Sequence, residues 1–181
     1  MKVLSTEIEG VLEIELDVHR DPRGWLVETF RASTFERLGL PFRFVQDNAA
    51  RSAQRALRGL HFQRRPGQSK LVRVTRGAAF DVAVDVRAGS PSFGRFVARR
   101  LEEGDGKLLF LPAGFAHGYQ ALTDDVEVAY KLGSEYLPSE EAGLAWDDPA
   151  IGVPWPLPEP VLSPRDLAWP RLAELEPWRA P

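Results

Sequence analysis

The feature that most constrains the fold of this chain is an alternation of apolar and polar side chains with a period of two residues. In residues 11–18, VLEIELDV, the alternation places Leu12, Ile14 and Leu16 on one face and acidic side chains on the other. A period of two is typical of a half-buried β-strand. Similar segments recur along the chain, separated by turns about every 8 to 12 residues, and they predict about nine short strands.

Short strands at this spacing, joined by Gly- and Pro-containing turns, are typical of an antiparallel sandwich or barrel. Among these all-β architectures, a jelly roll is the favoured version. Beyond residues 11–18, strands are expected within 24–30, 42–48, 57–63, 70–90, 93–106, 107–122 and 124–133.

Two short helices are predicted in addition to the strands. The first covers residues 33–40, where Ser33 and Glu36 form a capping box and Gly39 provides a C-terminal stop. The second begins at Ser163–Pro164, because proline is favoured in the first turn of a helix.

The chain has 181 residues, a length that allows one domain with a sizeable core. We expect a single domain over residues 1–181, with the jelly roll ending at about residue 150. The remaining residues, 151–181, hold much of the proline and are expected to wrap over the barrel.

Composition excludes several classes of function. The chain has no cysteine, which excludes disulfides, thiolate nucleophiles and cysteine metal sites. Its net charge of −3 provides no overall basic field for nucleic acids or acidic membranes. The first residues do not resemble a secretory signal, and no stretch approaches ~18 uninterrupted apolar residues. We therefore expect a cytoplasmic protein.

One of only three histidines lies in LRGLHFQRRPGQSK, residues 57–70. In a strand that begins near Leu57, His61 and Gln63 share a face, and Arg58 joins them only if the strand twists or bulges. His61 is then a packed core residue, a metal ligand or a general base. A metal site is disfavoured because the segment has no His-x-His pair. An imidazole inside a barrel is suited to proton abstraction near pH 7.

Two neighbours favour the general base. Lys70 begins the next strand, and Tyr130 alternates with Val128 and Leu132 on a later one. Taken singly, Lys70 fits a solvated strand end and Tyr130 fits core packing. Together with His61 they supply a cation, an acid and a base, a set that fits proton abstraction next to a carbonyl.

A second group of side chains fits an anionic ligand. Arg23 and Arg58 have the fork geometry that suits a diphosphate, and Gln46 and Asn48 add amide groups. Charged surface turns are the alternative interpretation of these residues. The sequence has no Gly-rich phosphate loop that opens a helix.

Read in order, these residues resemble the dTDP-4-dehydrorhamnose 3,5-epimerase family. The resemblance runs from about residue 8 to residue 166. Its matching stretches are GVLEIELDVHRDPRGWLVETF, FVQDNAARS, LRGLHFQ, KLVRVTRGAAFDVAVDVR, SPSFGRFV, LPAGFAHGYQAL, VAYK and WDDPAIGVPWP. It implies a cupin-type jelly roll, a homodimer, no metal or cofactor, and a dTDP-linked 4-keto-6-deoxyhexose as substrate.

The resemblance also implies roles for individual residues. His61 falls at the position of the catalytic base, Tyr130 at that of the acid, and Lys70 at that of the contact to the sugar and enolate oxygen. Asp166 falls at the carboxylate that pairs with the base, although its place three residues after Ser163 also fits a helix cap. The implied substrate contacts are Arg23, Glu28, Gln46, Asp47, Asn48, Arg58, Lys70, His117, Glu141 and Arg165.

Three positions depart from the pattern of the family. His19 stands where phenylalanine is common, and Ala49 and Ala50 stand where histidine and serine are common. Glu135 stands where many members have an aromatic ring that stacks on thymine, and Tyr136 follows it. Either Tyr136 or another ring takes that role, or the nucleotide selectivity is altered.

The resulting functional hypothesis is an isomerase that inverts C3 and C5 of dTDP-4-dehydro-6-deoxy-D-glucose in dTDP-L-rhamnose synthesis. An epimerase of another deoxysugar pathway that inverts only C3 or only C5 is the first alternative. A nucleotide-sugar-binding barrel without turnover is disfavoured because binding needs no matched acid and base. A metal-dependent cupin oxygenase or isomerase is disfavoured by the missing His-x-His pair.

Overall fold

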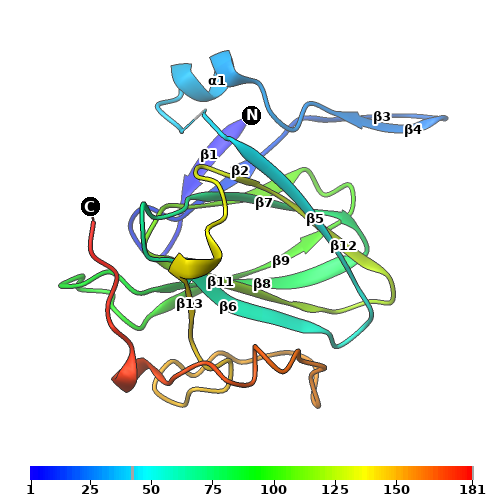
Figure 1. Ribbon diagram of the computed structural model, residues 1–181. Helices are drawn as coiled ribbons and strands as arrows, with labels where there is room; N and C mark the ends of the chain where they lie inside the picture. Colours follow the sequence, from blue (N-terminus) through cyan, green and yellow to red (C-terminus); the bar gives the residue numbers. More distant parts are fainter. Residues whose placement is uncertain (42, 181) are drawn as a thin grey trace.

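The computed structural model describes residues 1–41 and 43–180. Two antiparallel sheets face each other, and a two-stranded hairpin extends beyond them (Figure 1). The six-stranded sheet has the order β1 (Lys2–Ser5), β2 (Leu12–Glu15), β10 (Lys107–Leu111), β7 (Lys70–Arg76), β12 (Val126–Leu132), β5 (Gln46–Ser52). The five-stranded sheet has the order β13 (Glu141–Gly143), β6 (Leu57–Gln63), β11 (Phe115–Ala121), β8 (Ala78–Asp85), β9 (Phe96–Glu102). The hairpin pairs β3 (Val18–Asp21) with β4 (Gly24–Val27). The predicted antiparallel jelly roll is confirmed.

The period of two residues determines what lies between the sheets. Along β12, Val126, Val128 and Tyr130 belong to or pack against the inner core, whereas Lys131 reaches Asp47 on the outer side. The inner core is almost wholly aliphatic and aromatic, which makes apolar burial between the sheets the main source of their attraction.

The outer face of each sheet is also covered. Phe35 of α1 (Ala32–Arg37) packs with Ile14 and Phe110 on the six-stranded sheet. The C-terminal segment, orange to red in Figure 1, places Trp155 and Trp178 against the five-stranded sheet. With both faces buried, β11 is buried at every residue, so its sequence shows no alternation.

The helices differ in detail from the sequence prediction. The helix α1 begins after Arg31, and no side chain of the described residues caps it, so the predicted capping box was wrong. Ser33 lies inside the first turn rather than at its N-cap, while Gly39 adopts the expected left-handed conformation, with φ +69°.

The helix predicted to begin at Ser163–Pro164 was also wrong, because residues 164–167 form a turn. Two short 3₁₀ turns, η1 (Pro138–Glu140) and η2 (Leu172–Glu174), occur instead in this half of the chain. No helix within residues 1–41 and 43–180 is long and apolar enough to cross a membrane.

An irregularity in β6 determines where its side chains point. His61 pairs with His117 of β11, but Arg58 pairs with Tyr119, so β6 has one more residue than β11 between these pairs. This bulge lets Arg58 and His61 line one cavity, although strict alternation would separate them. Gly59 lies in the bulge with φ +104°, and a Cβ there would lie 2.5 Å from the His117 carbonyl oxygen.

Gly59→Ala is expected to lower the free energy of unfolding by more than about 3 kcal/mol, because it combines a positive φ with a clash against backbone atoms. The matched control is Gly89→Ala. Gly89 has φ +75° and open space around a Cβ, so only the backbone term of about 1–2 kcal/mol applies. Urea unfolding measures the free energy of unfolding of both variants. Equal decreases would show that the close approach of β6 and β11 does not add to the destabilisation by Gly59→Ala.

Candidate active site

Two adjoining cavities open between the sheets at one end of the barrel, and His61, Lys70, Tyr130 and Arg165 line both. The larger, of about 330 Å³, is also lined by Gln46, Asn48, Phe62, Gln63, Gln68, Leu132, Tyr136 and Glu141. The smaller, of about 200 Å³, is also lined by Ala50, Arg58, His117, Gly118, Tyr119, Ser163 and Asp166. The structure therefore brings together most of the residues that the sequence singled out.

Strand register explains why the predicted base and acid meet. His61 and His117 are direct partners across β6 and β11 in the five-stranded sheet. Lys70 is the partner of Leu132 across β7 and β12, so Tyr130, two residues before Leu132, shares its inward face. The imidazole and the phenol therefore enter the cavity from opposite sheets, where they can act on opposite faces of one ligand.

The carboxylate of Asp166 holds His61. Asp166 Oδ1 lies 2.5 Å from His61 Nε2, while Oδ2 accepts a hydrogen bond of 2.7 Å from the Ser163 hydroxyl. Burial would raise the pKa of the Asp166 carboxyl, but hydrogen bonds from His61 and Ser163 outweigh it and lower the pKa. Of the two alternatives from the sequence, the contact with His61 is present, whereas the helix that Asp166 would cap is not, since residues 164–167 form a turn.

Lys70 places an ammonium group inside the protein. Its side chain is buried, and Nζ donates a hydrogen bond of 3.2 Å to the His61 carbonyl oxygen. Burial lowers the pKa of Lys70 to about 8, against the opposing effect of the carboxylates of Asp81 and Glu141. An ammonium that is costly to bury is stabilised by a developing negative charge next to it.

His117 is held in a similar way by a residue that the sequence analysis did not single out. Its Nε2 lies 2.9 Å from Oδ2 of Asp81, which is fully buried, and its ring meets that of Tyr130 edge to face at 6.4 Å. Asp81 lies on β8 between the inward-facing Ala79 and Ala83. An acid at an inward position of an otherwise apolar strand could have identified it from the sequence.

Two arginines point positive charge at the cavities. The Nε of Arg58 donates a hydrogen bond of 3.0 Å to the hydroxyl of Ser52, which also contacts the buried Tyr119 hydroxyl. Arg165 pairs with Glu141 at 2.7 Å near the opening. With Lys70, these guanidinium groups make the cavity suited to an anionic ligand.

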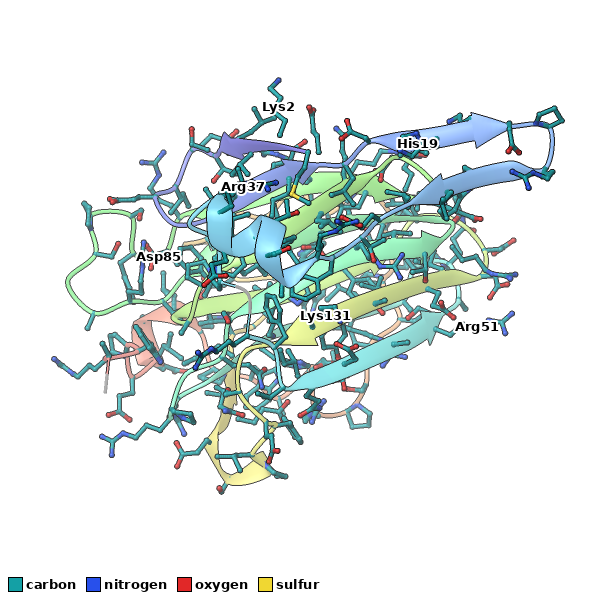
Figure 2. All side chains as sticks on the ribbon, turned by 90° about the horizontal axis from the view of Figure 1, so that it is seen from above. Lys2, His19, Arg37, Arg51, Asp85 and Lys131 are labelled. Atoms are coloured by element: carbon teal, nitrogen blue, oxygen red, sulfur yellow. The ribbon has the colours of Figure 1, made fainter. Side chains whose placement is uncertain are left out.

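Three predicted ligand residues are not brought into these cavities by their own chain. Asp47 points outward and pairs with Lys131, on the outer face that Figure 2 views from above. Arg23 lies in the β3–β4 turn, where it pairs with Asp21. Glu28 follows β4 and pairs with Arg31.

The structure separates Glu135, which departs from the family pattern, from the neighbouring Tyr136. Tyr136 lines the larger cavity, whereas the exposed Glu135 is not among the described residues that line it.

Within residues 1–41 and 43–180, no group of three or more His, Cys, Asp and Glu side chains is placed to hold a metal ion.

Comparison with known proteins gives a consistent result. Residues 5–174 match the family model described as dTDP-4-dehydrorhamnose 3,5-epimerase. The Escherichia coli K12 dTDP-4-dehydrorhamnose 3,5-epimerase is 48% identical over 169 residues, covering 92% of this chain and 91% of that protein.

Two solved structures are similar throughout. The first is a dTDP-6-deoxy-D-glucose-3,5-epimerase from Legionella pneumophila in complex with dTDP-4-keto-L-rhamnose, with a TM-score of 0.94, 40% identity and coverage of 98% and 97%. The second, the 3'-monoepimerase ChmJ from Streptomyces bikiniensis, has a TM-score of 0.88, 40% identity and coverage of 93% and 86%. Sequence, fold and cavity thus agree that this chain belongs to the dTDP-4-dehydrorhamnose 3,5-epimerase family of carbohydrate epimerases.

Proposed function

We propose that this protein inverts C3 and C5 of dTDP-4-dehydro-6-deoxy-D-glucose to give dTDP-4-dehydro-L-rhamnose, a step in dTDP-L-rhamnose synthesis. The observation that carries the proposal is the arrangement of His61 and Tyr130, which enter one cavity from opposite sheets beside the buried ammonium of Lys70. Inversion of a carbon requires a base on one face of the sugar and an acid on the other, and this arrangement supplies both.

In the proposed reaction, His61 removes a proton from the carbon next to the C4 ketone, and the C–H electrons move to form an enolate. Asp166 stabilises the imidazolium that results, while Lys70 stabilises the enolate oxygen. Tyr130 then protonates the same carbon from the opposite face. His61 releases its proton and Tyr130 regains one, so the carbon-bound hydrogen exchanges with solvent. Each acid–base step contributes on the order of 10²–10⁴-fold.

The proposal assigns the nucleotide sugar to the predicted contacts that line the two cavities, with Tyr136 as the contact to its thymine ring. These contacts are Gln46, Asn48, Arg58, His117, Glu141 and Arg165. It needs no metal or cofactor, because the ketone makes the adjacent C–H bonds acidic and Lys70 supplies positive charge. A charged nucleotide sugar does not cross a bilayer unaided, so we place the reaction in the cytoplasm.

The runner-up is an epimerase that inverts only one of the two carbons. The similarity to the 3'-monoepimerase ChmJ favours it, at the same 40% identity as the Legionella 3,5-epimerase. Both activities use the same base and acid, so the two proposals differ only in which carbons exchange.

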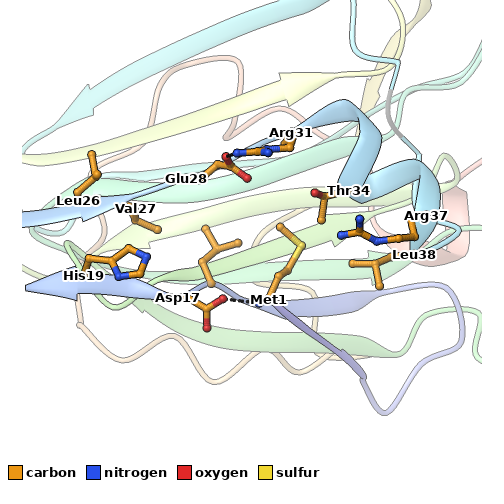
Figure 3. A pocket seen from close by; sticks show the side chains of 11 residues that line it. Met1, Asp17, His19, Leu26, Val27, Glu28, Arg31, Thr34, Arg37 and Leu38 are labelled. Carbon is orange, nitrogen blue, oxygen red and sulfur yellow. Dashed lines mark hydrogen bonds and ion pairs between the residues drawn. The ribbon is translucent and has the colours of Figure 1, made fainter.

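We further propose a homodimer in which each hairpin serves the partner's site. Arg23 and Glu28 are predicted substrate contacts, yet the hairpin extends away from the barrel of its own chain (Figure 1). An open cavity of about 720 Å³ lies between the hairpin and α1. Figure 3 shows the apolar and charged side chains that line it. Leu26 beside it is 73% exposed and Trp25 is 42% exposed. Exposed apolar groups next to an open cavity fit a subunit interface.

The reaction is tested by solvent exchange. Incubation with dTDP-4-keto-6-deoxyglucose in D₂O is expected to place deuterium at C3 and C5, read by NMR, and His61→Ala and Tyr130→Phe are expected to reduce turnover by about 10²–10⁴-fold. Retained dTDP binding shows that each variant keeps its fold. Deuterium and inversion at one carbon would support the single-centre enzyme. Wild-type turnover in both variants would remove His61 and Tyr130 from the mechanism.

The charge of Lys70 gives a pH prediction. Its pKa of about 8 means that the ammonium is present below that pH and lost above it, so kcat/KM is expected to fall as the pH rises through about 8. Arginine stays charged, so Lys70→Arg is expected to be slower but to lack this decline. A decline at the same pH in Lys70→Arg would assign it to another group.

Subunit mixing tests the homodimer. His61→Ala and Arg23→Ala proteins are unfolded together and refolded as a 1:1 mixture. If Arg23 serves the partner's site, mixed dimers contain one complete site each, and about a quarter of all sites regain wild-type kinetics. If Arg23 serves its own chain, no dimer contains a complete site and mixing restores nothing. Light scattering provides the oligomeric state independently.

A further inference from the structure

The segment that follows β12, residues 133–137, carries Tyr136, which lines the larger cavity and is 41% exposed. The residue is held by hydrogen bonds at its hydroxyl and at its backbone. Its hydroxyl donates a hydrogen bond of 3.0 Å to Glu141, and its backbone N–H donates one of 2.8 Å to the side chain of Gln46. An exposed aromatic ring is thereby fixed at the edge of a cavity that suits an anionic ligand.

Gln63 binds the backbone on either side of this tyrosine. Its Oε1 accepts a hydrogen bond of 2.9 Å from the Leu137 N–H, and its Nε2 donates one of 3.2 Å to the Glu135 carbonyl oxygen. The same Nε2 donates to the Ser134 hydroxyl at 3.2 Å. Since only the amide oxygen can accept from Leu137, the orientation of the side chain is determined.

These contacts use nearly all of the bonding capacity of the Gln63 amide. Both hydrogens of Nε2 and one lone pair of Oε1 are engaged by residues 134–137, and the side chain is only 3% exposed. Gln63 lies on β6 two residues after His61, so the strand that carries the predicted base also anchors the segment that carries the ring.

We propose that Gln63 is a positioning residue, which fixes the Tyr136 ring for contact with the thymine ring of the nucleotide sugar. This inference rests on the proposed function and deepens it. Gln63 acts through Tyr136, because its own amide is already engaged. A ring that is ordered before the ligand arrives loses little freedom on binding, so its tethers contribute to affinity.

The effect is expected in binding rather than in chemistry. The thymine of the substrate is separated from the reacting carbons by the two phosphates. A contact to thymine therefore acts equally on the ground state and the transition state. Interactions of that kind change KM and leave kcat nearly unchanged. A role for Gln63 in the fold alone would lower kcat and stability together, because His61 shares its strand.

A double-mutant cycle tests the inference. The dissociation constant of dTDP is measured by titration calorimetry for the wild type, Gln63→Met, Tyr136→Ala and the double variant. Methionine is close to glutamine in size but removes its hydrogen bonds to residues 134–137 without adding charge to a cavity that suits an anion. Gln63→Met is expected to raise the dissociation constant about tenfold when the Tyr136 ring is present and less than about twofold when it is absent. KM rises in parallel, with kcat changed less than about threefold.

The matched control is Gln54→Met. Gln54 also donates to a backbone carbonyl, that of Leu122 at 2.9 Å, but at an exposed turn away from the cavity residues. This control is expected to bind dTDP like the wild type. If Gln63→Met fails to fold, Gln63→Asn, which adds no charge and is one methylene shorter, replaces it in the cycle.

The outcomes separate this inference from the proposed function. Loss of the Gln63 effect in the Tyr136→Ala background supports the inference. If the Gln63 substitution changes the dissociation constant equally in both backgrounds, or in neither, the inference is overturned. The proposed function still stands in that case, provided that the wild type binds dTDP and turns over its sugar. A wild type that neither binds dTDP nor turns over the sugar removes both.

Discussion

The contact between His61 and Asp166 is the interaction on which the proposed chemistry depends, and it joins two parts of the chain with different structural origins. His61 comes from a regular strand of the barrel, whereas Asp166 lies in a turn of the C-terminal segment, 105 residues away. That segment is held by apolar packing on the outer face of the five-stranded sheet, where Trp155 and Trp178 contribute large rings. The orientation of the predicted base therefore depends on burial that occurs on the opposite side of the sheet from the cavity.

The same architecture explains how charge is maintained inside an apolar molecule. Both sheets are covered on both faces, so a polar group that points between them is removed from water. Such a group is costly unless it is paired. The described structure pairs His61 with Asp166 and His117 with Asp81, and it sets Lys70 against a carbonyl oxygen. These partners keep the side chains in place before a ligand enters, which lowers the reorganisation needed during reaction.

The strands, the residue types of the cavity and part of its geometry could be predicted from the sequence. Alternation identified the inward face of β12, and the register then places Tyr130 beside Lys70 as expected. The bulge that brings Arg58 to the side of His61 was foreseen only as a condition, because it depends on contact with β11. The capping box of α1 and the second helix were mispredicted from local motifs. No side chain of the described residues caps α1, and the Ser163 hydroxyl accepts a hydrogen bond from the Asp166 N–H in a single turn that does not continue as a helix.

The sequence by itself determined the all-β class and the chemical groups available, because a period of two residues and the identity of a side chain are local properties. Tertiary structure alone decided how those groups are used. It divided the two oxygens of Asp166 between His61 and Ser163, turned Asp47 away from the cavity, and placed Arg23 in the turn of the β3–β4 hairpin. The reason is that strand register, bulges and the course of the C-terminal segment follow from contacts between residues far apart in the chain, which no local pattern encodes.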